Sequence, residues 1–136
     1  MIGRRIALVL ACLAGAALTA CGDAGTLAPR DPEPGTLTVM LTTPAADDRA
    51  VLISVSGPDE AGAVTDAGGG YSVYARPGGT ALRVAVFGKI SSGKLVTLSV
   101  PDVNRASAYR ATIQEVVDPS SNVRPSLAGY SAAITR

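Results

Sequence analysis

The chain has 136 residues with 12 basic and 11 acidic side chains, and it contains neither His nor Trp. Its only two cysteines, Cys12 and Cys21, lie near the N-terminus, which excludes Cys–His and Ser–His catalysis and internal disulfides from the remainder. Removing Arg4 and Arg5 with an N-terminal signal leaves one more acidic than basic side chain, so we expect no nucleic-acid partner.

The first twenty residues have the three-part layout of a secretory signal peptide. Arg4 and Arg5 provide a charged start, residues 6–18 form an uncharged apolar run, and small residues lead to Cys21. The apolar run is shorter than the ~20 residues that a membrane-spanning helix needs. A removable signal is therefore favoured over a permanent transmembrane anchor.

The four residues Leu18-Thr19-Ala20-Cys21 resemble the lipobox of bacterial lipoproteins. This resemblance implies that Cys21 is acylated and becomes the membrane-attached first residue of the mature protein. The alternative is an ordinary signal-peptidase site beside an unmodified thiol, which would be open to oxidation and wrong pairing in an exported protein. Because Gly22, and not Asp, follows Cys21, sorting to the outer membrane of the cell envelope is favoured.

Residues 22–34 alternate Pro, Gly and charged residues without apolar periodicity, as a solvated tether does. The sequence therefore divides into a signal peptide at 1–20, a lipidated Cys21 with its tether at 21–34, and a folded domain at 35–136.

From Gly35 onward, short runs rich in Val, Ile, Thr, Leu and Tyr are separated by Gly, Pro, Asp and Asn. This pattern predicts an all-β fold, an antiparallel seven-stranded β-sandwich of immunoglobulin-like architecture. The predicted strands cover 36–42, 51–55, 71–75, 80–88, 94–100, 109–117 and 129–135. Short helices at 103–108 and within 58–64 stay open as alternatives.

Alternation within the predicted strands indicates which side chains face the core. In the sixth strand it places Tyr109, Ala111, Ile113 and Val117 on one face. In the fourth strand Leu82, Val84 and Val86 alternate with Arg83, Ala85 and Phe87, which turns Arg83 and its two partners outward. The residues expected in the core are Leu37, Val39, Leu41, Ile53, Val55, Val84, Val86, Leu98 and Ile113.

Three consecutive stretches, at 84–88, 93–100 and 111–118, resemble in their apolar rhythm the middle and end of cohesin-type domains, with a Gly-x-Leu opening at Gly93. The resemblance covers about 52–135 and implies a β-sandwich. No dockerin-recognition residue maps onto the chain, so it implies neither that partner nor any binding residue.

Several polar groups are candidates for catalysis, and each has a simpler interpretation. Ser91, Ser92 and Lys94 allow a Ser–Lys pair, but Ser-Ser-Gly-Lys is also typical of a hairpin turn. The acidic pairs 47–48 and 59–60 fall in predicted turns, where adjacent carboxylates are usually solvated. The turn interpretations are favoured, and we expect the protein not to be an enzyme.

Two further segments suggest ligand loops. Residues 118–122 place oxygen side chains at alternate positions, as calcium loops do, but Val123 and Gly129 stand where an EF-hand loop needs Gly and Glu. The glycines at 68–70 and 78–79 lack the Gly-Lys-Ser/Thr ending of a phosphate loop. We therefore expect turns at these places, no metal site and no cofactor.

Four tyrosines are candidates for a carbohydrate-stacking platform, although such residues more often close the ends of a sandwich. They are Tyr71, Tyr74, Tyr109 and Tyr130. The sequence favours a lipid-anchored binding module whose partner is a protein or a glycan. A structural envelope component and, after it, a hydrolase accessory domain are the alternatives.

Overall fold

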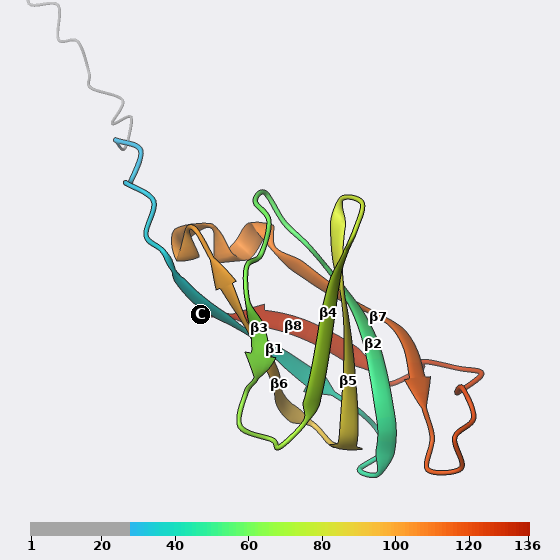
Figure 1. Cartoon of the computed structure of the whole chain (residues 1–136). Helices are drawn as coiled ribbons and strands as arrows, with labels where there is room; N and C mark the ends of the chain where they lie inside the picture. The colour runs from blue at the N-terminus through green and yellow to red at the C-terminus, as the bar shows by residue number, and fades with distance from the viewer. Residues whose placement is uncertain (1–27) are drawn as a thin grey trace, which may run out of the picture.

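The computed structural model describes residues 28–136, so the predicted signal peptide, the lipobox and Cys21 lie outside the described residues. The described part contains eight strands and one short 3₁₀-helix, which confirms the prediction of an all-β sandwich (Figure 1). The strands are β1 (Gly35–Thr42), β2 (Asp48–Ser56), β3 (Val64–Asp66), β4 (Ser72–Gly78), β5 (Ala81–Ile90), β6 (Gly93–Val100), β7 (Arg110–Val117) and β8 (Ser131–Thr135), and the helix η1 is Val103–Ala108. In this part of the chain no helix is long and apolar enough to cross a membrane.

The strands form two four-stranded antiparallel sheets, in the orders β3-β6-β1-β8 and β4-β5-β2-β7. The pairing is nested, because β1 pairs with β8, β2 with β7, β3 with β6 and β4 with β5. This is a two-sheet sandwich of the predicted architecture with its own strand order, since β1 lies between β6 and β8 and β2 lies in the other sheet. In Figure 1, β1 and β8 run obliquely behind β4, β5 and β2.

The strand that the sequence did not reveal is β3, which makes the strand count eight and not seven. Only three residues long, it is too short to show an alternating pattern. It becomes a strand by pairing with β6, where Val64 lies opposite Leu98. The helix considered at 103–108 is present as η1, and Asp102 caps it by accepting a hydrogen bond from the backbone N–H of Asn104.

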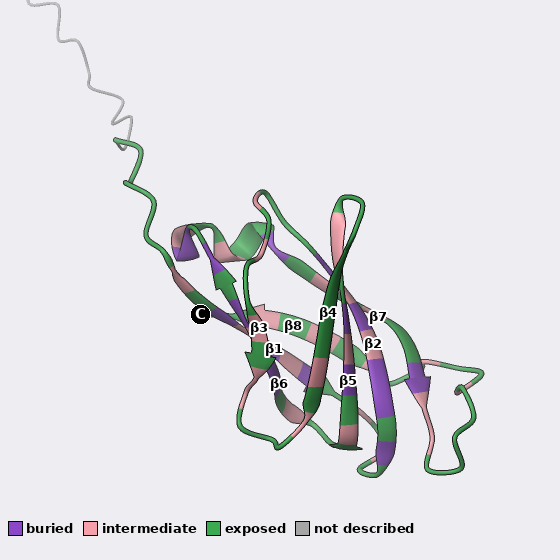
Figure 2. Ribbon diagram, viewed as in Figure 1, coloured by how far each residue is buried: buried purple, intermediate pink, exposed green. Residues whose placement is uncertain are grey.

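The core lies between the two sheets and contains eight of the nine predicted residues as fully buried side chains. Ile113 is half-buried and packs against them. Alternating buried and exposed positions along the central strands are visible in Figure 2. Arg83 is exposed between half-buried Leu82 and buried Val84 of β5, as its predicted orientation requires. Further buried side chains, outside the list of nine, include Val51, Ile90, Leu95, Val96, Val100, Tyr109 and Val116.

The prediction that Val117 shares a face with Ile113 is wrong, and a β-bulge is the reason. Ile53 of β2 lies opposite Ile113, but the next residue, Leu52, lies opposite Glu115, so Gln114 is the extra residue. An extra residue reverses the faces of everything that follows it in the strand. Val116 is therefore buried opposite Val51, and Val117 is only half-buried.

The end of the predicted tether is attached to the sandwich. The N–H of Glu33 donates to the Asp102 carboxylate, and the carbonyl of Glu33 accepts from the N–H of Val103. The Glu33 carboxylate also pairs with Arg136 near the C-terminus. The hydrogen bond from Glu33 is the largest cause of a lowered pKa for Asp102, so the carboxylate remains charged and holds the start of the domain in place.

Candidate functional site

The outer surface of the β4-β5-β2-β7 sheet carries the most unusual set of exposed side chains. On β5, Val84 and Val86 are buried, so Arg83, Ala85 and Phe87 point away from the core. The register then places their neighbours on β4, β2 and β7 on the same surface. Figure 2 shows β4 exposed along most of its length.

Strand pairing orders these outward residues into rows that cross the sheet. The first row is Ser72, Phe87, Ala50 and Val117; the second is Tyr74, Ala85, Leu52 and Glu115; the third is Arg76, Arg83, Ser54 and Thr112. Ala50 is the one buried member of these rows. Arg110, opposite Ser56, lies beyond the third row. We call this surface the aromatic–arginine face.

Two aromatic rings lie in contact on this face. Tyr74 is 65% exposed and Phe87 is 47% exposed. Their ring centroids are 5.9 Å apart and their planes lie at 73°, an edge-to-face arrangement. Such a contact stabilises the pair by about 0.5–1.5 kcal/mol. The rings hold each other in place, and a large apolar area stays open to solvent.

Three arginines occupy the adjacent end of the face. Arg76 lies directly opposite Arg83 on the neighbouring strand, an arrangement of like charges that destabilises a sheet. All ion pairs of residues 28–136 involve other cations, namely Arg105, Arg124 and Arg136. The guanidinium groups of Arg76, Arg83 and Arg110 are exposed and carry uncompensated charge.

The four tyrosines do not come together. Tyr71 is half-buried, Tyr109 is buried in the core, and the Tyr130 hydroxyl donates to Asp48 at 2.6 Å. Only Tyr74 lies on the face, and its aromatic neighbour is Phe87. Alternation along residues 80–88 already turned Phe87 outward, but its contact with Tyr74 depends on which strands are neighbours.

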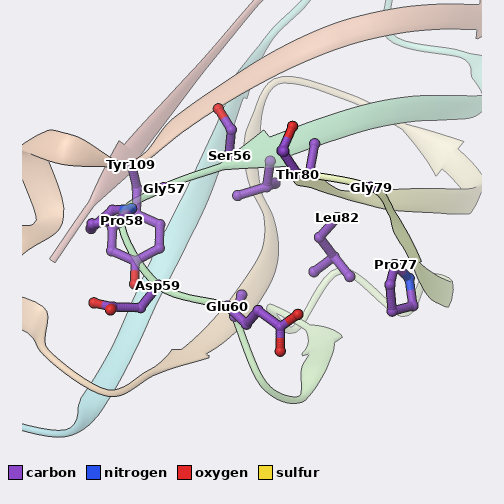
Figure 3. A pocket seen from close by; sticks show the side chains of 13 residues that line it. Ser56, Gly57, Pro58, Asp59, Glu60, Pro77, Gly79, Thr80, Leu82 and Tyr109 are labelled. Carbon is purple, nitrogen blue, oxygen red and sulfur yellow. The ribbon is translucent and has the colours of Figure 1, made fainter.

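A cavity of about 280 Å³ lies where the loop after β2 meets the β4–β5 hairpin (Figure 3). Tyr109 and Asp59 lie together on one side of it, and Leu82 and Pro77 lie on the other. The Tyr109 ring packs against Gly57, where any Cβ would collide with it. Burial, and after it the charge of Asp59, raises the pKa of Tyr109. The phenol is therefore neutral at neutral pH.

Asp48 differs most from its predicted role. The acidic pair 47–48 was expected in a solvated turn, but Asp48 is fully buried at the start of β2. Its carboxylate accepts hydrogen bonds from Nε of Arg124 at 2.7 Å and from Tyr130 at 2.6 Å. Burial and then the bond to Asp48 raise the pKa of Tyr130. This cluster ties residues 124–130 to the sheet.

The remaining candidates serve turns. The segment at 91–92 is not the predicted hairpin, because β5 and β6 belong to different sheets and the segment crosses between them. The Ser92 hydroxyl accepts from the N–H of Thr43 and donates to the Thr43 carbonyl, so it closes a contact between two loops. Asp118 accepts from the backbone N–H groups of Ser120 and Asn122, as the predicted Asx-type turn requires. Asp66 accepts from two backbone N–H groups within the 68–70 glycine turn. Asp59 pairs with Arg105.

No family model, no curated protein and no solved structure matches this chain. The likeness to the lipobox and to cohesin-type domains therefore stays a prediction from the sequence.

Proposed function

We propose that the protein is a lipid-anchored component of the bacterial cell envelope whose sandwich is a non-catalytic binding module for a glycan. The observation that carries this proposal is the exposed Tyr74–Phe87 pair on a regular sheet surface. Exposed apolar side chains that lie together in one patch, unlike single scattered ones, mark interaction sites.

The surroundings of the two rings favour a sugar as the ligand. Their partners across the β4–β5 pair, Ser72 and Ala85, have small side chains, so the rings project above the neighbouring sheet surface. Aromatic rings pack on the C–H faces of sugars, and the Tyr74 hydroxyl adds a hydrogen-bonding group at the edge of the contact. Because the rings brace each other, little conformational entropy is lost on binding.

The anchor rests on Cys21 and its sequence context. Each buried methylene of an acyl chain contributes about 0.8 kcal/mol, so two or three chains hold a protein on a bilayer almost permanently. Glu33 is joined to the sandwich by hydrogen bonds of its backbone to Asp102 and Val103 at the start of η1. The residues between Cys21 and Glu33 then form the spacer between the membrane and the sandwich.

Replacing both rings tests the binding face. The double variant Tyr74→Ala/Phe87→Ala is expected to lower glycan affinity at least tenfold, which corresponds to ~1.4 kcal/mol. Glycan-array screening of the full-length product in detergent identifies a ligand, and calorimetry measures its affinity for parent and variant. Thr36→Ala is the control, because Thr36 is exposed on β1, on the outer surface of the other sheet. Equal affinities for parent and double variant contradict the proposed site.

Cys21→Ser is expected to abolish both lipid labelling and membrane retention. The hydroxyl cannot form the thioether that carries the diacylglycerol, so the apolar anchor is lost. Metabolic labelling with a radioactive fatty acid, followed by membrane fractionation, compares parent and variant. Cys12→Ser serves as the control, since Cys12 lies inside the predicted signal peptide. Labelling of the Cys21→Ser chain at the parent's level excludes the lipoprotein assignment.

A further inference from the structure

We infer that the glycan bound by the aromatic–arginine face is acidic, with a carboxylate of a uronic acid held between Arg76 and Arg83 and a neutral sugar over the Tyr74–Phe87 pair. This inference rests on the proposed function and specifies the ligand of that site. Its basis is the placement of uncompensated charge beside the exposed rings.

The spacing of the rows suits a ligand that crosses from rings to arginines. Tyr74 and Arg76 are two residues apart on β4, which corresponds to about 6.8 Å along a strand. Arg76 and Arg83 are direct partners across β4 and β5, where strands lie about 4.8 Å apart. One anionic group can therefore contact both guanidinium groups while the adjoining sugar remains within reach of the rings.

Electrostatics favours an anion at this place. The two like charges repel each other in the free protein, and no acidic side chain in residues 28–136 forms an ion pair with either. A bound carboxylate removes the repulsion and accepts charge-assisted hydrogen bonds. Guanidinium groups bind carboxylates through two parallel N–H donors, which fixes orientation as well as charge.

The other polar groups indicate a glycan in preference to an anionic bilayer or an acidic peptide. Ser54 and Thr112 continue the arginine row across β2 and β7. Their hydroxyls match the many donors and acceptors of a sugar. Glu115 lies in the row of Tyr74, where it repels a second anion. The Glu115 carboxylate would repel a uniformly anionic bilayer or peptide. An oligosaccharide with its negative charge at one end places that charge on the arginines and away from Glu115.

The test uses uronate oligosaccharides of several linkages and the carboxyl-reduced, neutral form of each, with the full-length protein in detergent. The parent is expected to bind at least one uronate oligosaccharide tenfold or more tightly than its reduced form, with an affinity that falls as salt is raised. Arg76→Met/Arg83→Met is expected to remove that preference and leave affinity for the reduced form within twofold. Arg30→Met, which removes an exposed guanidinium outside the sandwich, is the control.

The outcomes separate this inference from the proposed function. If acidic and reduced forms bind equally and both are lost in Tyr74→Ala/Phe87→Ala, the ligand is a neutral glycan and only the inference fails. If neither a uronate oligosaccharide nor a reduced form binds, the inference fails, and the proposed function fails with it only if the glycan array also yields no ligand. Tighter binding to poly-glutamate, or to micelles containing phosphatidylglycerol, than to every uronate also overturns the inference, because it assigns the arginines to a peptide or a lipid surface.

Discussion

Arg124→Met is expected to lower the free energy of unfolding by about 3–5 kcal/mol, because it leaves a buried charge without its counterion. Asp48 is 0% exposed, and Arg124 and Tyr130 are the side chains that donate to its carboxylate. Methionine keeps the aliphatic stem, so the loss reports the guanidinium. Urea denaturation followed by circular dichroism measures it as a shift of the midpoint at unchanged slope.

Two comparisons give this result its meaning. Arg83→Met makes the same chemical change at an exposed position and is expected to alter stability by no more than about 0.5 kcal/mol. Removing the whole cluster in Asp48→Leu/Arg124→Met/Tyr130→Phe is expected to recover most of the loss, since no buried charge remains. A similar midpoint for Arg124→Met and Arg83→Met would show that the Asp48 cluster contributes little to stability.

Leu98→Ala is expected to lower the free energy of unfolding by about 2–5 kcal/mol, because it opens a cavity in the centre of the core. Leu98 is 0% exposed and lies in β6 between Leu37 of β1 and Val64 of β3. Domains of this kind are stable by about 5–15 kcal/mol, so the variant loses a large part of the total. Thermal and urea unfolding both measure the effect.

The next residue is the matched control for Leu98. Ser99 is exposed on the same strand, and Ser99→Ala is expected to change stability by about 0.5 kcal/mol or less. If Ser99→Ala were the more damaging of the two, the β6 register would be displaced by one residue, and the two faces of that strand would exchange.

The predictions that succeeded depend on local periodicity. Leu37, Val39 and Leu41 face the core because successive side chains of a strand point to opposite faces. This alternation can be recognised from neighbouring residues in the sequence alone. Where an extra residue enters a strand the rule fails, as at Gln114, because a bulge is defined by the neighbouring strand. The strand β3 escaped prediction for a similar reason, since its three residues become a strand only beside β6.

The candidate site was less accessible to prediction than the fold. The sequence turned Phe87 and Arg83 outward, but it could not show that β4 lies beside β5 with Tyr74 in contact with Phe87 and Arg76 opposite Arg83. It also assigned the acidic pair 47–48 to solvent, because the partners of Asp48 are 76 and 82 residues away along the chain.

By itself the sequence determined the all-β class, the inward faces of the long strands and the glycine and Asx turns, because these follow from period-two alternation and from the conformational preferences of Gly, Pro, Asp and Asn. The tertiary structure alone decided the strand order, the β7 bulge, the burial of Asp48 and the joining of rings and arginines on one face. Each of these depends on residues distant in the chain, which meet only when the two sheets pack and exclude water from the core.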